Sequence, residues 1–273
     1  MTAPWVREVG DGRPPAPVVL VLGGFLTSPP LYRPLRRGLL GRGAADVVVG
    51  GVWTMDWLLA ASRGLGPILT RSGRALLEAS RRSDDLSGGA PVLVIGHSAG
   101  GMSARLLTSP VAYAGRRLNG SSRIGAIVTL GTPHVVALHD GSRNRVGAEA
   151  AAFANGVIPG PFSAPATGYL AVASRKVVGR RAGSVGERRT WAVYGDLTPE
   201  PVTDEITGDG LIPLASALLP GAAQLVLDDA AHGQGIGRDW YGSERFVDRW
   251  WPLALEAWRG ALLARASAQA EKL

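Results

Sequence analysis

The sequence predicts an α/β fold with a mostly parallel central sheet flanked by helices. Short apolar runs such as Val18 to Leu22 alternate with longer segments that have one apolar side, as Leu31, Leu35 and Leu39 do. Uninterrupted apolar runs suit strands that are buried on both faces, which is the environment of a parallel sheet. The 273 residues, 46% of them hydrophobic, suffice for one domain with a sizeable core.

The order of these segments predicts repeated strand–helix–strand units. Pro29 and Pro30 can open a helix after the first strand, and such a unit requires a right-handed crossover to a parallel strand. Ser243 is a plausible N-cap for a last helix that reaches about Ala270. The predicted strands are Val18 to Leu22, Ala45 to Val49, the run that begins at Pro91, Ile124 to Leu130, Thr190 to Tyr194 and Ala223 to Leu227.

Residues 134–189 differ in composition from the rest of the chain. They are rich in small residues, Gly, Pro and scattered aromatics, with helical patterns at 148–154 and 169–178. We therefore predict a helical cap or lid, inserted into a core of residues 1–133 and 190–273. Its apolar residues would face substrate as well as core. The candidate substrate contacts in this segment are His134, Phe153 and Phe162, with His139 as a further pocket residue.

Composition excludes several kinds of site. The chain has no cysteine, so a thiolate nucleophile and disulfides are excluded, and its four histidines are too few and unpatterned for a zinc site. We expect no metal and no cofactor. The net charge of +7 comes from arginines that are scattered rather than clustered, which argues against nucleic acid but leaves weak association with anionic membrane surfaces open.

The N-terminus lacks the charged start and apolar core of a signal peptide, and no run approaches the roughly 18 apolar residues of a membrane span. A cytoplasmic location is the resulting expectation. The sequence predicts no oligomeric state.

The stretch PVLVIGHSAGG, residues 91–101, carries the strongest indication of chemistry. A bare Gly-x-Ser-x-Gly string is weak evidence in a chain with 38 glycines. Here an apolar strand precedes it and a helical segment follows, which is the context of a nucleophile elbow. Side chains at Gly96 or Gly100 would clash as such a turn closes, and Ser98 would adopt a strained backbone conformation. Ser98 is therefore the candidate nucleophile.

A serine hydroxyl needs a base to take its proton and a carboxylate to orient that base. His232 is the candidate base because it follows the last predicted strand. The acid is either Asp209, in GDGLIP, or Asp196, directly after the strand predicted at 190–194. We favour Asp209 because flanking glycines free the backbone to aim its carboxylate.

Backbone amides of Ala99 and Phe25 are candidates for an oxyanion hole, because one follows the nucleophile and the other lies in the turn after the first strand. Gly24, Leu26 and His97 adjoin these positions and are candidate substrate contacts. The residue before the nucleophile of an elbow points away from the site, so His97 could instead pack or hydrogen-bond locally.

These pieces together resemble a known superfamily. The chain is similar to α/β-hydrolases of the lipase and esterase type, and within them to GPI inositol-deacylase-like and lipase-like proteins of cyanobacteria and plants. The resemblance implies an α/β-hydrolase fold with Ser98, Asp209 and His232 as nucleophile, acid and base. One departure is Leu22 before the glycines of the oxyanion turn, where many lipases have histidine. The matching stretches are GGFLTSPPLYRPL, VLVIGHSAGG, LGTPH, GDGLIP with SALLPGA, LDDAAH and WYGS.

We therefore expect a serine esterase or lipase that acts on a small-molecule or lipid acyl ester. A polyester depolymerase, a thioesterase and an acyltransferase would use the same three residues, and the sequence does not separate them. A catalytically dead binding protein with the same fold is the alternative outside the enzymes.

Overall fold

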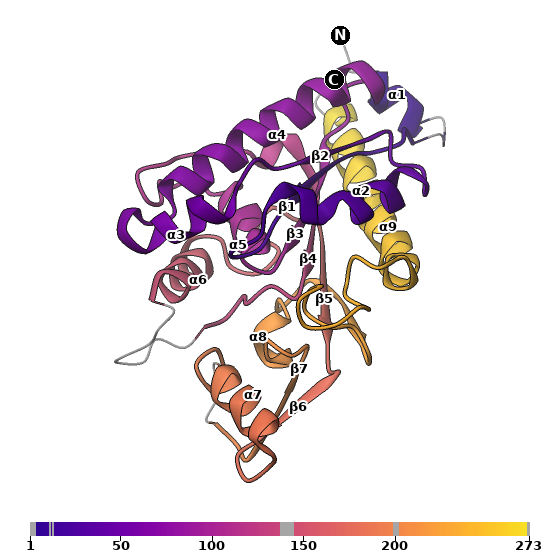
Figure 1. Ribbon diagram of the computed structural model, residues 1–273. Helices are drawn as coiled ribbons and strands as arrows, with labels where there is room; N and C mark the ends of the chain where they lie inside the picture. The colour runs from indigo at the N-terminus through magenta and orange to yellow at the C-terminus, as the bar shows by residue number, and fades with distance from the viewer. Residues whose placement is uncertain (1–3, 11, 13, 137–144, 199–201, 272–273) are drawn as a thin grey trace.

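Six parallel strands form the central sheet, in the order β2-β1-β3-β4-β5-β8 (Figure 1). The computed structural model describes residues 4–10, 12, 14–136, 145–198 and 202–271, so the candidate His139 lies outside the described residues. The strands are β1 (Val18–Leu22), β2 (Asp46–Val49), β3 (Val92–His97), β4 (Ile124–Leu130), β5 (Gly168–Ser174) and β8 (Ala223–Leu227).

Helices cover both faces of this sheet. Successive side chains of a strand point to opposite faces, so Val19 and Val21 of β1 join one core cluster and Leu20 joins the other. The helices are α1 (Pro4–Gly10), α2 (Arg33–Leu40), α3 (Thr54–Arg63), α4 (Gly66–Leu86), α5 (Ala99–Leu106), α6 (Arg145–Val157), α7 (Val185–Gly195), α8 (Leu214–Ala217) and α9 (Glu244–Ala270), with short 3-10 turns η1 (Pro29–Tyr32) and η2 (Ser121–Arg123).

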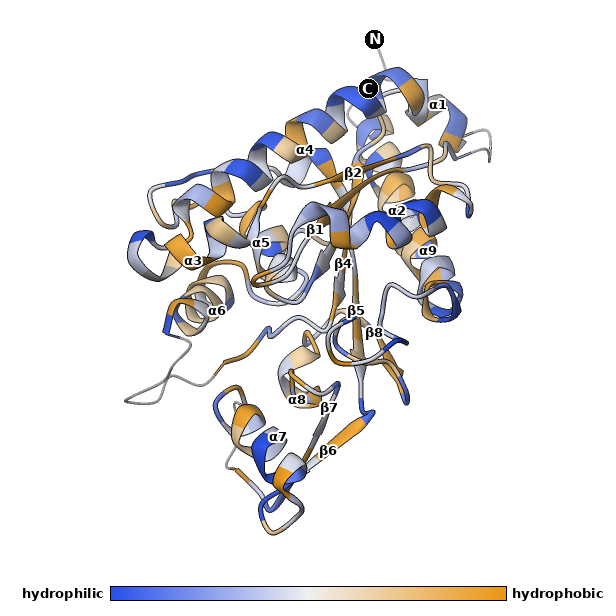
Figure 2. Ribbon diagram, viewed as in Figure 1, coloured by the Kyte–Doolittle hydropathy of each residue, from blue (hydrophilic) through white to orange (hydrophobic). Residues whose placement is uncertain are grey.

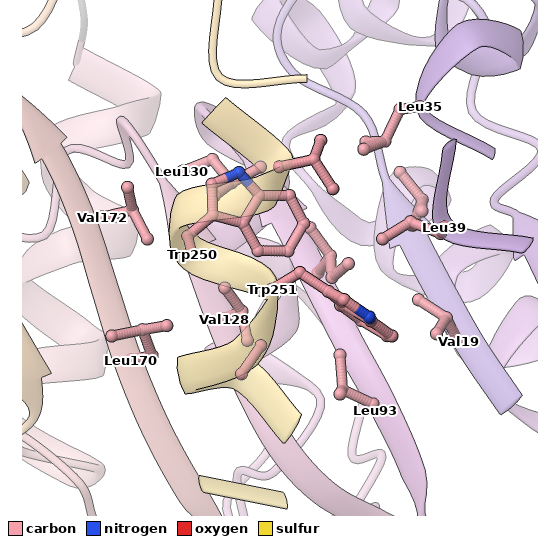
Figure 3. Close-up of a cluster of buried hydrophobic side chains, with 14 of the residues drawn as sticks. Val19, Leu35, Leu39, Leu93, Val128, Leu130, Leu170, Val172, Trp250 and Trp251 are labelled. Atoms are coloured by element: carbon pink, nitrogen blue, oxygen red, sulfur yellow. The ribbon is translucent and has the colours of Figure 1, made fainter. Parts of the chain in front are cut away.

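The first face is covered mainly by α9 and α2. Trp250 and Trp251 of α9 lie over Val128 of β4 and its neighbours (Figure 3), and all are buried. The opposite face is covered by α4 and α5, whose Ala75, Leu76 and Ala104 pack on the strands. Figure 2 shows hydrophobic residues along the strands of the sheet and hydrophilic residues along much of α4. Burial of both faces explains why the strands read as unbroken apolar runs.

The sequence predictions for β1, β2, β3, β4 and β8 are confirmed, with β1, β4 and β8 matching residue for residue. Two predictions are wrong. The segment 169–178, expected to be helical, contains most of β5 (residues 169–174), because pairing with β4 and β8 outweighs the helical preference of the alanines in GYLAVAS. Thr190 to Tyr194, expected to be a strand, lies in α7, which Ser184 and Glu187 cap reciprocally.

The boundaries predicted for the cap need a matching correction. β5 lies inside the central sheet between β4 and β8, so residues 168–174 belong to the core and not to an insertion. The segment outside the sheet that follows it contains β6 (Val177–Arg180), α7 and β7 (Glu205–Gly208). β6 and β7 form an antiparallel pair that projects from the body together with α7 (Figure 1).

The carboxyl ends of the parallel strands share one edge of the sheet, and four connections meet there. β1 leads to Gly23 and Gly24, β3 to Ser98, β4 to Gly131, and β8 to the loop that holds His232. This edge is where open parallel sheets place their ligand sites.

Within the described residues, no helix combines the length and apolar character needed to cross a bilayer.

Candidate active site

Ser98 lies in a strained turn between β3 and α5. Its φ of 54° and ψ of −129° are a conformation that residues with a side chain rarely adopt. A Cβ atom at Gly96 would collide with the backbone of Gly101, and one at Gly100 would collide with the carbonyl oxygen of Leu22. The two glycines thus permit the close backbone approach that lets Ser98 occupy the strand end.

Three side chains from separate segments meet at this turn. His232 Nε2 lies 3.0 Å from Ser98 Oγ, and His232 Nδ1 lies 2.8 Å from Asp209 Oδ2. All three side chains are buried. Because an ionised carboxylate only accepts hydrogen bonds, Nδ1 carries the imidazole proton, and Nε2 is left to accept from the serine hydroxyl. This geometry can deprotonate Ser98 as its oxygen attacks an electrophile.

The carboxylate of Asp209 receives several further donors. The backbone amides of Leu211 and Ile212 donate to Oδ1 at 3.0 and 2.8 Å, and the Tyr241 hydroxyl donates to Oδ2 at 2.9 Å. Burial opposes ionisation of Asp209, but the charge and hydrogen bond of His232 together with these amides outweigh it and hold the pKa of Asp209 below its ordinary value. Asp196, the other candidate acid, is exposed at the end of α7.

One candidate oxyanion donor, Ala99, follows Ser98 in the sequence, and the other, Phe25, follows Gly24 in the turn after β1. Ala99 is the first residue of α5, so its N–H is among the amides that lack an acceptor within the helix. Gly24 lies against the nucleophile, since a Cβ there would be 2.8 Å from Ser98 Cβ. The Gly24 N–H donates to the Tyr32 hydroxyl at 2.8 Å and is therefore already engaged, so the next amide, that of Phe25, remains the candidate from this turn.

The side chains of this turn face outward. Phe25 is exposed and its ring contacts Trp57 of α3, with ring centroids 5.8 Å apart. Leu26 is exposed with a φ of 57°, and its carbonyl accepts from the Thr54 hydroxyl. Phe25 and Leu26 thus contribute apolar surface at the rim of the site.

The structure corrects the assignment of His134 to a substrate pocket. His134 has no exposed surface, and its Nε2 lies 2.9 Å from Thr129 Oγ1 while its backbone N–H donates to the carbonyl of Ser216. Burial, with the nearby charge of Arg105, lowers its pKa well below the ordinary value. His134 is a neutral packing residue because the chain after β4 turns directly into the core.

Phe162 is also misassigned. It precedes β5, and because β5 runs parallel to β3, the residues before it lie at the opposite edge of the sheet from Ser98. Phe153 of α6 is half-buried and stacks on Tyr113, with centroids 4.7 Å apart. Its ring packs beside α5 in the cluster that includes Met102 and Leu106.

His97 is not open to substrate either, which corrects its assignment as a substrate contact. It is buried, its Nδ1 lies 2.8 Å from the Tyr32 hydroxyl, and its Nε2 lies 2.7 Å from the carbonyl oxygen of His232. Burial, followed by the proximity of His232, lowers its pKa to about 3. His97 therefore has the local hydrogen-bonding role that was its alternative interpretation.

Three residues that contact the site were not identified from the sequence. Tyr241 donates to Asp209, Tyr32 contacts both Gly24 and His97, and a Cβ at Gly131 would lie 2.7 Å from Asp209 Oδ2 and 3.2 Å from His232 Nδ1. All three lie in stretches that carry the family resemblance, WYGS, GGFLTSPPLYRPL and LGTPH, so those motifs were the available signal.

In the part of the chain that the structure describes, no cluster of three or more His, Asp or Glu side chains could hold a metal.

Comparison with known proteins agrees with the fold. No known protein family and no curated protein matches the sequence. Among solved structures, the chain is similar to the lipase BlEst2 of Bacillus licheniformis in its mature form, with a TM-score of 0.59, 16% identity and coverage of 88% of this chain and 93% of that one. The propeptide form of the same lipase gives a TM-score of 0.61 at 16% identity, covering 88% of this chain and 50% of that one. The protein has the α/β-hydrolase fold.

Proposed function

We propose that the protein is a serine hydrolase that cleaves carboxylic esters through an acyl-enzyme on Ser98. The observation that carries this proposal is the continuous contact from Ser98 Oγ through His232 to Asp209, at 3.0 and 2.8 Å. The fold shared with a structure described as a lipase is in keeping with it. His232 is the proposed general base and Asp209 the proposed orienting acid.

In the proposed acylation, Ser98 Oγ attacks the ester carbonyl carbon while its proton passes to His232 Nε2. Negative charge then develops on the carbonyl oxygen, and the backbone N–H groups of Phe25 and Ala99 donate to it; loss of one such donor costs roughly 3 kcal/mol in comparable enzymes. The ester C–O bond breaks, and His232 gives its proton to the departing alkoxide, which leaves as an alcohol. Asp209 stabilises the imidazolium throughout.

Deacylation repeats these steps with water. His232 takes a proton from a water molecule as its oxygen attacks the acyl carbon, and the same two amides stabilise the second oxyanion. The bond to Ser98 Oγ breaks, His232 returns the proton to that oxygen, and the carboxylic acid leaves. No cofactor or metal takes part in this scheme.

The rim of the site favours an apolar acyl group. Phe25, Leu26 and Leu31 of the β1–α2 connection are exposed, as are Trp53, Met55 and Leu58 at the start of α3. The two segments lie side by side, since Thr54 bonds to both Ser28 and Leu26. Exposed apolar side chains gathered around a site mark a surface for an apolar partner. We infer that the substrate is a lipid-like ester, as a lipase would use.

Related activities would use the same groups. A polyester depolymerase or thioesterase differs in the group that leaves, and an acyltransferase differs in the acceptor that reaches the acyl-enzyme. The narrower resemblance to GPI inositol-deacylase-like proteins remains a prediction, as does a role for parts of residues 134–189 as a cap over the acyl group. A dead binding protein is disfavoured because each expected catalytic group has its partner within hydrogen-bonding distance.

The deciding experiment is hydrolysis of p-nitrophenyl esters from acetate to palmitate, with fluorophosphonate labelling of wild type and Ser98→Ala in parallel. We expect turnover and labelling in the wild type, a preference for longer chains, and loss of both signals in Ser98→Ala. A wild type that neither labels nor hydrolyses any chain length would contradict the proposal and favour the binding protein.

Substitutions of His232, Asp209 and Asp196 test which aspartate is the acid. His232→Ala should cost nearly as much activity as Ser98→Ala, and Asp209→Ala somewhat less, because the three residues act as a unit. Asp196→Ala is the matched control and should retain wild-type turnover. Loss of activity in Asp196→Ala with an active Asp209→Ala would show that the acid is misassigned.

A further inference from the structure

We infer that Tyr32 and His97 are positioning residues, which join the oxyanion turn to the base through one directed chain of hydrogen bonds. The chain runs from the Gly24 amide through Tyr32 and His97 to the backbone of His232. The inference rests on the proposed function, because it assigns these residues a part in that same reaction. Neither residue contacts the reacting atoms.

The direction of the chain follows from its last contact. His97 Nε2 lies 2.7 Å from the carbonyl oxygen of His232, and a carbonyl can only accept, so Nε2 carries the proton. Burial lowers the pKa of His97 to about 3, so the ring is neutral at pH 7. The other nitrogen, Nδ1, is therefore an acceptor with a free lone pair.

Tyr32 supplies the donor for that lone pair. Its hydroxyl lies 2.8 Å from His97 Nδ1, and burial raises the pKa of Tyr32, so it keeps its proton. Thr27 Oγ1 is a second acceptor, but it is farther away, at 3.2 Å, and its own hydroxyl already donates to the Gly24 carbonyl. The Tyr32 oxygen in turn accepts from the Gly24 N–H at 2.8 Å.

The chain of hydrogen bonds links two parts of the site that lie far apart in the amino-acid sequence. Gly24 precedes Phe25, whose amide is the proposed oxyanion donor, and its backbone lies against Ser98. His232 lies 208 residues after Gly24 in the sequence, in the loop that follows β8. With its amide held by Tyr32, Gly24 directs the following amide toward the site, while His97 holds the backbone of the base.

Packing restricts both side chains to this arrangement. Trp240 lies edge-on to both rings, with centroid distances of 6.0 Å to Tyr32 and 5.2 Å to His97. Tyr32 and His97 are themselves 5.9 Å apart in a T-shaped contact. The Tyr32 hydroxyl can be removed while its ring keeps these contacts, which makes this link of the chain testable by a conservative substitution.

The primary test is Tyr32→Phe, with kcat expressed per active site titrated by a fluorophosphonate. We expect kcat to fall about tenfold with KM unchanged, because the two hydrogen bonds that the hydroxyl makes, from the Gly24 amide and to His97, are lost and alignment matters most in the transition state. Tyr169→Phe is the matched control: it removes another buried tyrosine hydroxyl that accepts a backbone amide, that of Ser163, on β5 away from the triad. It should keep the wild-type kcat.

Substitution of His97 tests the second link. His97→Gln retains an amide that can donate to the His232 carbonyl and should stay within about tenfold of wild type, whereas His97→Leu should lose about 10²-fold in kcat. Adding Tyr32→Phe to His97→Leu should change kcat less than twofold, because the chain is already broken.

Three outcomes separate the alternatives. A Tyr32→Phe variant with full kcat per labelled site overturns the positioning role, as does equal activity of His97→Gln and His97→Leu. If a substitution only lowers the fraction of protein that folds, fewer sites are labelled while kcat per labelled site stays the same. This outcome also contradicts the inference. If His97→Leu fails to fold, Tyr32→Phe decides by itself. A wild type that neither labels nor turns over esters instead overturns the proposed function, and this role with it.

Discussion

The carboxylate of Asp209 shows how one residue's environment supports the site. It is buried, which by itself disfavours a charge, yet His232, Tyr241 and two backbone amides donate to it. These donors come from two segments, the turn of residues 209–212 and the β8–α9 connection, which carries both His232 and Tyr241. These contacts, which only the folded chain makes, keep the carboxylate ionised although it is buried.

Low pH should therefore reduce the free energy of unfolding. The pKa of Asp209 is lower in the folded than in the unfolded chain, so the unfolded state binds more protons and stability falls as pH drops. The contribution is fully present above the unfolded value of about 4 and is lost as pH falls through the folded value. Urea unfolding of wild type and Asp209→Asn from pH 7 to pH 3 should show the wild-type advantage shrinking below about pH 4. A constant difference over this range would contradict the assignment.

Gly131 is a second residue whose identity the site requires. Its φ is +56°, and a Cβ would meet Asp209, Tyr241 and His232 at 2.7 to 3.2 Å. Gly131→Ala should reduce kcat/KM by at least about 10²-fold, because displacement of His232 and Asp209, the proposed base and acid, by even a fraction of an ångström would disrupt their alignment. Ester hydrolysis per folded protein is the measurement.

Gly115→Ala separates collision from backbone strain. Gly115 also has a positive φ, +72°, but nothing lies within 4 Å of the Cβ position. Both variants should lose some stability from strain, and only Gly131→Ala should lose activity. Equal activity of the two variants would show that Gly131 matters for its backbone alone.

At the scale of elements, the start of α3 carries exposed apolar side chains and is joined through Thr54 to Leu26 and Ser28 of the β1–α2 connection. Met55 and Leu58 are 62% and 54% exposed. Met55→Gln with Leu58→Gln should leave hydrolysis of p-nitrophenyl acetate unchanged and reduce hydrolysis of emulsified long-chain esters several-fold, since a polar rim holds apolar chains less well. Leu86→Gln, at the far end of α4, is the control and should alter neither rate. Equal losses on both substrates would contradict a role in acyl recognition.

The end of α6 depends on a buried cation of α5. Arg105 Nη2 donates to the carbonyl of Ile158 at 2.9 Å and to Asn155 Oδ1 at 3.1 Å, and it also reaches the carbonyl of Ala154. Burial lowers the pKa of Arg105 to about 10, so it remains charged at neutral pH. This side chain supplies donors to the Ile158 carbonyl, just past the end of α6, and to Asn155 Oδ1, while the Ala154 carbonyl also accepts from the Ile158 amide.

Arg105→Met should therefore lower the free energy of unfolding by about 2 kcal/mol, the cost of leaving those buried acceptors unpaired. Urea denaturation measures the change. Arg145→Ala, which removes an exposed arginine paired with Glu149 at the start of α6, is the control and should leave the denaturation midpoint unchanged. Equal midpoints for wild type and Arg105→Met would contradict the capping role.

At the scale of the whole molecule, the net charge of +7 predicts weak attraction to anionic lipid surfaces. Sedimentation with phosphatidylserine-containing vesicles at 50 mM salt should retain the protein, and 0.5 M salt should release it because the screening length falls below about 5 Å. Phosphatidylcholine vesicles are the control and should bind less. Equal binding to both vesicles at all salt concentrations would contradict an electrostatic contribution.

The sequence alone determined the α/β class, the strands β1, β2, β3, β4 and β8, and the elbow. These features produce local signals: a strand buried on both faces is an unbroken apolar run, and a turn with close backbone contacts needs glycine. Ser98 was singled out because it directly follows such a strand, and His232 because it lies in the loop after the last strand, β8, which is a partly exposed edge strand.

The tertiary structure decided what depends on partners distant in the chain. β5 is rich in alanine and becomes a strand only between β4 and β8, while the apolar TWAVY segment is helical within α7. The contact of Asp209 with His232, and the chain from Gly24 through Tyr32 and His97, join residues brought together by the parallel order of the sheet. Such contacts arise from strand pairing rather than local preference, so no single stretch of sequence encodes them.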